Sequence, residues 1–192
     1  MSHNHSHTEA CQCAGKSQFG QSLDELEFQR GLWSSASSGN LSRVSSLISS
    51  GRDVNEVDTS GYTALHYAAR NGHVDICRLL TSKGASPNAR TKADATPLHR
   101  AAYRGNVKVI ELLIAAGATL DAIDDEGMTP LHKAASERQN DAFEFLSQQG
   151  ASTELKDKKG RTASEIMNRK FRSYDLGVMS PTRFHCATSL MR

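Results

Sequence analysis

Histidine recurs along this chain at a fixed interval. His66, His99 and His132 follow one another every 33 residues, and each closes the pattern Thr-x-Leu-His. Imidazole binds zinc and exchanges protons near neutral pH, so repeated rings suggest a metal site or an acid–base site. A fixed period of this length indicates one structural unit per ring, and rings that lie one unit apart cannot all be about 2 Å from a single zinc ion. We therefore expect a structural role for these three histidines.

A second group of possible metal ligands lies near the start of the chain. Thiolate and imidazole are preferred donors for zinc and copper. Structural zinc sites usually space their cysteines as C-x2-C on folded elements, and the Cys-Gln-Cys segment here does neither. We predict a disordered leader over residues 1–21 that takes up metal only adventitiously, and a metal-handling function through the leader is kept as an alternative. The ligands concerned are His3, His5, His7, Cys11 and Cys13.

No other set of residues resembles a catalytic site. The chain lacks the Walker A, G-x-S-x-G and H-E-x-x-H patterns, and no pair of carboxylates has a spacing that argues for acid–base work. We expect a non-enzyme with no cofactor and no small-molecule substrate.

Composition narrows the class of protein. The 192 residues are one domain by length, and 38% hydrophobic with 23% charged residues is typical of a soluble globular protein. A net charge of +2 is too small to indicate a nucleic-acid or membrane partner. No apolar run could span a bilayer, no signal-peptide pattern opens the chain, and the four cysteines do not form a disulfide framework. We therefore expect a cytoplasmic or nuclear protein.

The histidines belong to a longer repeat. Thr63, Thr96, Thr129 and Thr162 share the 33-residue interval, which predicts a solenoid. An Ala-Ala pair follows the first three Thr-x-Leu-His patterns, and glycines recur with the same period at Gly51, Gly84, Gly117 and Gly150. Threonine is a good helix N-cap and glycine a good left-handed helix stop, so both should delimit helices.

The Thr-Pro-Leu-His core and the 33-residue length resemble those of the ankyrin repeat. The resemblance implies an all-α ankyrin-repeat solenoid, in which stacked helix-turn-helix repeats are joined by β-hairpin fingers. It also implies that each histidine ring hydrogen-bonds neighbouring backbone. We place the domain at residues 22–172 and a flexible tail at 173–192. Within the domain we predict a degenerate first repeat at about 25–57, repeats at 58–90, 91–123 and 124–156, and a capping half-repeat at 157–172.

Some positions within these repeats are informative individually. A capping box at Ser22–Glu25 predicts the first helix, and Trp33 is expected to anchor the packing of the first repeat. Cys77 occupies a position where other repeats carry aliphatic or aromatic residues, so it should be buried and inert. Asp94 replaces a finger glycine and should adopt positive φ.

The resemblance implies that binding residues come from the finger tips and the concave face of the first helices. The cluster of Arg70, Tyr103 and Arg104 is the most promising, because Arg and Tyr are enriched in interface hot spots. The alternative is that these side chains only solvate the groove. We expect a monomeric scaffold that binds an acidic and aromatic protein segment; a ubiquitin-ligase adaptor role lacks support, since no second domain is recognisable. The candidate residues are Tyr62, Arg70, Asn71, Lys92, Tyr103, Arg104, Asp125, Glu126, Met128 and Glu137.

Three positions are candidates for modification. Asn55 and Asn88 occupy the hairpin asparagine that, in ankyrin proteins resembling this one, is often hydroxylated by an iron and 2-oxoglutarate dependent enzyme. The alternative is a purely structural asparagine. Ser180 precedes Pro181 and matches a minimal proline-directed phosphorylation signal, which is weak because such dipeptides are common.

Overall fold

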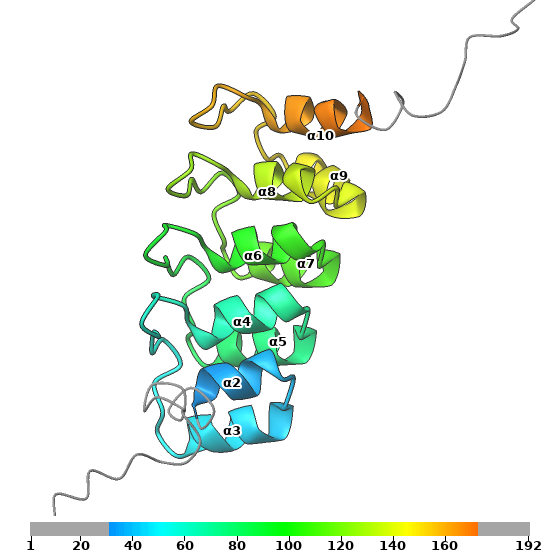
Figure 1. Ribbon diagram of the computed structural model, residues 1–192. Coiled ribbons are helices and arrows are strands. Elements are labelled where there is room, and N and C mark those ends of the chain that lie inside the picture. Colours follow the sequence, from blue (N-terminus) through cyan, green and yellow to red (C-terminus); the bar gives the residue numbers. More distant parts are fainter. Residues whose placement is uncertain (1–30, 173–192) are drawn as a thin grey trace, which may run out of the picture.

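A computed structural model describes residues 31–172 of the chain, with backbone alone for residues 170–172. Helices stack in pairs along one axis, and loops project from one side of the stack (Figure 1). The helices are α2 (Leu32–Ser37), α3 (Leu41–Ser49), α4 (Ala64–Asn71), α5 (Val74–Ser82), α6 (Pro97–Arg104), α7 (Val107–Ala115), α8 (Pro130–Ser136), α9 (Asn140–Gln148) and α10 (Ala163–Arg172).

The helices form two layers. In one layer α2, α4, α6, α8 and α10 each pack against the next, and in the other α3, α5, α7 and α9 do the same (Figure 1). Within a repeat the two helices also pack together, as α4 does with α5. Each repeat therefore contacts chiefly its neighbours, and the predicted all-α solenoid is confirmed.

The repeated residues build the core between the layers. The three Ala-Ala pairs and the leucines Leu65, Leu98 and Leu131 are wholly buried. Burial of these side chains removes apolar surface from water, and alanine loses no rotamer freedom in the process. The second helices contribute the buried Val44, Cys77 and Ile110. As expected, Cys77 is a core residue, and burial raises the pKa of its thiol to about 12, so the unreactive thiol form persists at neutral pH.

Helix ends follow the expected chemistry. The threonines before α4, α6 and α8 lie at the N-cap in an extended conformation, and in each case the third helical residue completes a capping box through its histidine ring. The glycines after the second helices have φ between 86° and 91°. Asp94 has φ of 54°, which confirms that the finger keeps its turn without glycine there.

The fingers are tight turns and not regular strands. Among residues 31–172 the β pairing amounts to one isolated bridge, between Lys156 and Thr162. Backbone hydrogen bonds still connect neighbouring fingers, such as the 3.1 Å bond from the amide of Lys92 to the carbonyl of Ser60. The same bond recurs from Asp125 to Ala93 at 3.1 Å. The fingers thus form a linked row along one edge of the stack.

The two ends of the described region are closed differently. Trp33 is half-buried, packs against the core and donates its indole N–H to the carbonyl of Glu56 at 3.0 Å, in agreement with an anchoring role. At the other end the side chains of Thr162 and Glu165 cap each other's backbone at 3.3 and 2.9 Å, and Ile166 of the same helix is buried. The helix and capping box predicted at Ser22–Glu25, the leader and the tail lie outside the described residues.

Candidate interaction surface

The three repeated histidines connect successive repeats. Each ring accepts the backbone N–H of its own N-cap threonine at Nδ1, at 3.1 Å for Thr63 and Thr96 and 3.3 Å for Thr129. The other ring nitrogen, Nε2, lies 3.0 to 3.1 Å from a carbonyl at the end of the next finger. A carbonyl only accepts, so Nε2 must carry the proton and the neutral ring is the tautomer that satisfies both bonds. These carbonyls belong to Ala95, Met128 and Arg161.

Burial holds two of these rings in the neutral form. Removal from water lowers the pKa of His66 and His99 to about 4, despite the opposing hydrogen bonds to the carbonyls of Ala95 and Met128. Within residues 31–172, no three His, Cys, Asp or Glu side chains gather where a metal ion could bind. The hydrogen bonds of the three rings agree with the expected structural role. The leader ligands His3, His5, His7, Cys11 and Cys13 lie outside this region.

The solvent-facing residues of the first helices lie in two rows one helical turn apart. The row nearest the fingers contains Tyr67, Arg100 and Lys133, and the next contains Arg70, Tyr103 and Ser136. Arg70, Arg104 and Glu137 are exposed near the ends of their helices, and Tyr103 is half-buried. The predicted cluster of Arg70, Tyr103 and Arg104 is therefore carried by the neighbouring helices α4 and α6.

Two of the predicted binding residues make contacts inside the protein. The Tyr62 ring lies under the guanidinium of Arg100, 4.9 Å from ring centroid to Cζ, and its hydroxyl accepts a hydrogen bond from Arg100 Nη2. The amide of Asn71 donates to the carbonyl and hydroxyl oxygens of Ser37 at 2.8 and 3.0 Å. Both side chains thus connect adjacent repeats, a role that their sequence positions did not predict.

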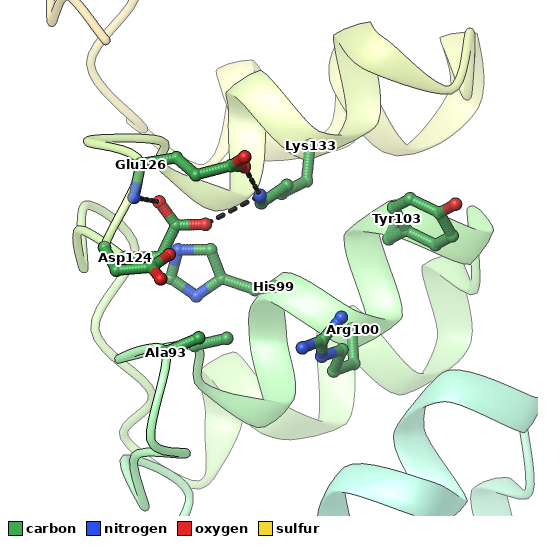
Figure 2. A pocket seen from close by; sticks show the side chains of 9 residues that line it. Ala93, His99, Arg100, Tyr103, Asp124, Glu126 and Lys133 are labelled. Atoms are coloured by element: carbon green, nitrogen blue, oxygen red, sulfur yellow. Dashed lines mark hydrogen bonds and ion pairs between the residues drawn. The ribbon is translucent and has the colours of Figure 1, made fainter. Parts of the chain in front are cut away.

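The finger before α8 is fastened to that helix by ion pairs. Lys133 Nζ lies 2.7 Å from Asp124 Oδ2 and 2.7 Å from Glu126 Oε2 (Figure 2). Burial alone would raise the pKa of Asp124, but hydrogen bonds from Lys133 and from backbone amides outweigh it and lower the pKa. Burial would likewise lower the pKa of Lys133, and its two carboxylate partners raise it instead. Glu126 is therefore held by Lys133, whereas the exposed Lys92 and Asp125 have no ion pair with any described residue.

A hollow of about 310 Å³ lies between these fingers and the first helices. Its walls include Ala93 from one finger, Asp125 and Glu126 from the next, and Arg100, Tyr103 and Lys133 from α6 and α8 (Figure 2). Met128, another candidate, is half-buried against the core. Arg100 and Lys133 were not among the predicted binding residues, although a step of 33 from Tyr67 leads to both.

Asn55 and Asn88 join one finger base to the next repeat. The Asn55 amide donates to the Gly84 carbonyl at 3.1 Å and accepts the Ser86 amide at 2.9 Å. Asn88 repeats this arrangement with Gly117 and Thr119 at 3.0 and 2.8 Å. Asn55 and Asn88 therefore have a structural role, and both residues are also exposed to solvent. Ser180 lies outside the described residues.

Comparison with known proteins gives consistent matches. The family described as ankyrin repeats (3 copies) matches residues 10–91 and 88–157. A stretch of 58 residues is 52% identical to ankyrin repeat domain-containing protein 39 of Homo sapiens, covering 30% of this chain and 32% of the human protein. For the protein of the same name from Bos taurus, 53 residues are 57% identical, covering 28% of this chain and 29% of the bovine one. The matched part thus spans about a third of the length of these curated relatives.

Ankyrin repeats are generally protein-interaction modules and are typically non-catalytic. No helix within residues 31–172 has the length and apolar character needed to cross a membrane. Because the family match covers more than half of the chain and agrees with the stacked helix pairs, this protein belongs to the ankyrin-repeat family.

Proposed function

We propose that this protein is a non-catalytic interaction module that holds a segment of a partner protein against its concave face and fingers. One observation carries the proposal: the recurring Thr, Leu, His and Ala residues at the first helices are buried in the core, whereas the solvent-facing rows change from repeat to repeat. The recurring set supplies stability and leaves its polar atoms satisfied. The varying set, centred on Arg70, Tyr103 and Arg104, supplies the cationic and aromatic groups that are common in hot spots.

The proposed partner segment is acidic and aromatic, since its carboxylates would meet Arg70 and Arg104 and its rings would pack on Tyr103. We also propose that the protein is monomeric and resides in the cytoplasm or nucleus. The composition and the absence of a disulfide framework in the sequence support this location. No described residue adds support for the metal-handling or ubiquitin-ligase alternatives.

Changing Arg70, Tyr103 and Arg104 together to alanine tests the proposal. All three side chains are at least partly exposed, so the helical circular dichroism should remain while recovery of partners falls at least tenfold, as expected for loss of several hot-spot contacts. Affinity capture from cells followed by mass spectrometry measures that recovery.

The matched control removes two positive charges from the other helix layer. Arg78 on α5 and Lys108 on α7 are exposed there, and their joint change to alanine should leave partner recovery unchanged. Equal recovery by the triple variant and the native protein would exclude this surface.

We further propose hydroxylation at Asn55 and Asn88, on the basis of their place in the ankyrin pattern and their exposure. Intact-mass measurement of protein purified from cells is expected to show a species heavier by one or two oxygen atoms, and changing both residues to alanine should remove it. A single unmodified mass would leave the two asparagines with their hydrogen-bonding role alone.

A further inference from the structure

Three of the fingers each carry an aspartate at the same position, and its carboxylate is hydrogen-bonded both to the finger backbone and to a nearby side chain. Asp58, Asp124 and Asp157 occupy the same position in three repeats, and Oδ1 of each accepts two backbone amides of its own finger at 2.8 to 3.0 Å. In each case Oδ2 then takes a side-chain donor. Those donors are the Tyr67 hydroxyl at 2.7 Å, Lys133 Nζ at 2.7 Å and Arg161 Nη2 at 2.6 Å.

One repeat lacks this carboxylate and keeps the donor. Thr91 stands where the other fingers carry aspartate, and among the described residues its hydroxyl oxygen accepts one backbone amide, that of Ala95, at 3.1 Å. Arg100 occupies the helix position of Tyr67 and Lys133, the two residues that bind finger aspartates in their own repeats. Arg100 forms no ion pair with any residue between 31 and 172. The guanidinium of Arg100 therefore lies where Tyr67 and Lys133 donate to a finger aspartate, but its own finger has no aspartate to accept from it.

The contacts that Arg100 does make are incomplete. Nη2 donates to the Tyr62 hydroxyl and the guanidinium lies over the Tyr62 ring, which is an electrically neutral partner. The buried Nε has no hydrogen-bond partner in the described part of the chain. A planar guanidinium presents its donors as a fork that matches a carboxylate, so an acceptor of that kind would complete its bonding.

The space for such an acceptor is present beside Arg100. Where other fingers carry Tyr62, Met128 or Arg161, this finger carries the small Ala95. Ala95 and Arg100 both line the hollow of about 310 Å³, and Figure 2 shows Arg100 and Tyr103 on the same side of α6 there. Thr91 in place of an aspartate and Ala95 in place of a large side chain thus leave an open space beside Arg100.

Charge around the hollow further defines its occupant. Lys133 is already engaged by Asp124 and Glu126, whereas Asp125 also lines the hollow and has no ion pair among residues 31–172. Among the charged residues that line the hollow, the two without an ion pair to any of residues 31–172 are therefore one cation, Arg100, and one anion, Asp125. An occupant with a carboxylate alone would meet repulsion from Asp125, so a basic group near that carboxylate fits better.

We propose that this hollow is a docking pocket for an acidic side chain of a partner protein, whose carboxylate binds Arg100 while a neighbouring Lys or Arg of the same segment binds Asp125. The inference rests on the proposed function and names a specific contact within it. Tyr103, one helical turn from Arg100, forms the wall against which the stem of the acidic side chain packs.

The repeat pattern itself supplies a variant that blocks the pocket from within. Changing Thr91 to aspartate places a carboxylate where Asp58 and Asp124 hold theirs, within the reach that Tyr67 and Lys133 use in their repeats. Arg100 should then be paired internally. The variant is expected to unfold at a higher temperature than the native protein and to lose the preference for acidic segments.

The test uses the full chain and a displayed library of random twelve-residue peptides. Peptides selected on the native protein are expected to pair an acidic with a nearby basic residue. By fluorescence polarisation, changing that acidic residue to Gln should weaken binding to the native protein about tenfold, which is typical for loss of a hydrogen bond between charged groups. The same peptide change should have little effect on binding to Arg100→Gln or Thr91→Asp.

Matched controls separate the pocket from general charge effects. Arg78→Gln, which removes one exposed charge from α5, should bind the selected peptides like the native protein. Asp125→Asn should remove the preference for the basic residue alone. Selected peptides without acidic residues, or acidic peptides that bind Thr91→Asp and Arg100→Gln as tightly as the native chain, would overturn the pocket.

The outcomes also separate this inference from the proposed function. Peptides that depend on Arg70, Tyr103 and Arg104 but ignore Arg100→Gln would leave the concave face as the interaction surface and reject the pocket. A library that yields no peptide on the native protein would count against both.

Discussion

Changing His99 to alanine should lower the free energy of unfolding by about 4 kcal/mol, which is a large fraction of the stability of a small domain. The ring is almost fully buried and joins the Thr96 amide, at 3.1 Å, to the Met128 carbonyl, at 3.0 Å. Without it, a buried donor and a part-buried acceptor lose their partners and a cavity remains. Urea-induced unfolding, followed by circular dichroism, measures the change.

His73 provides the matched control for this variant. Its ring is half-buried at the loop between α4 and α5 and makes one long-range hydrogen bond, 3.0 Å from Nε2 to the Ser37 carbonyl. His73→Ala should therefore cost only about 1 kcal/mol. Equal losses for the two variants would show that the ring of His99 does not link the repeats in the way its contacts indicate.

The fold could be predicted from the sequence because its stabilising contacts repeat. Recurring residues spaced three or four apart on a helix, such as Leu65 and Ala68, face the adjacent repeat in the same way each time. One pattern therefore specifies the whole core. The turn at Asp94 was also predictable, since the equivalent positions carry glycine. The repeat pattern did not predict which carbonyl accepts the hydrogen bond of each histidine. That carbonyl lies 29 residues further along the chain, and its position depends on how the repeats stack.

The candidate surface was predictable only in part. Tyr62 and Asn71 vary between repeats and were expected to face a partner, yet Arg100 and Ser37, more than 30 residues away, occupy their polar atoms. Residues of the row nearest the fingers were missed, because the contact of Lys133 with Asp124 depends on how the finger folds back onto α8. The sequence did contain one indication: Thr91 replaces the aspartate that the other repeats carry at the equivalent position. Its consequence for Arg100 follows only from the folded structure.

Acidification should destabilise the protein steeply between about pH 6.5 and pH 4. The pKa of His66 and His99 is about 4 in the folded protein, compared with an ordinary value of 6.5, because burial disfavours the charged ring. In this window the unfolded chain binds two protons that the folded protein excludes, so stability is complete above the ordinary value and is lost as the pH falls. Each ring accounts for about 3 kcal/mol, and the two together approach the whole stability of many small domains.

The slope of stability against pH distinguishes this mechanism from general weakening. His99→Gln removes one of the two titrating rings, so the variant should lose about 1.4 kcal/mol less per pH unit in this window, whatever its stability at neutral pH. Val109→Ala, which removes two methyl groups from a fully buried side chain, should lower stability by a similar amount at every pH and keep the native slope. The lowered pKa of Asp124 acts in the same direction only below this window, since its contribution is lost as the pH falls through and below its usual value of 3.8. Urea titrations at half-unit steps of pH measure the slopes, and identical slopes for His99→Gln and the native protein would mean that the buried ring does not control the acid sensitivity.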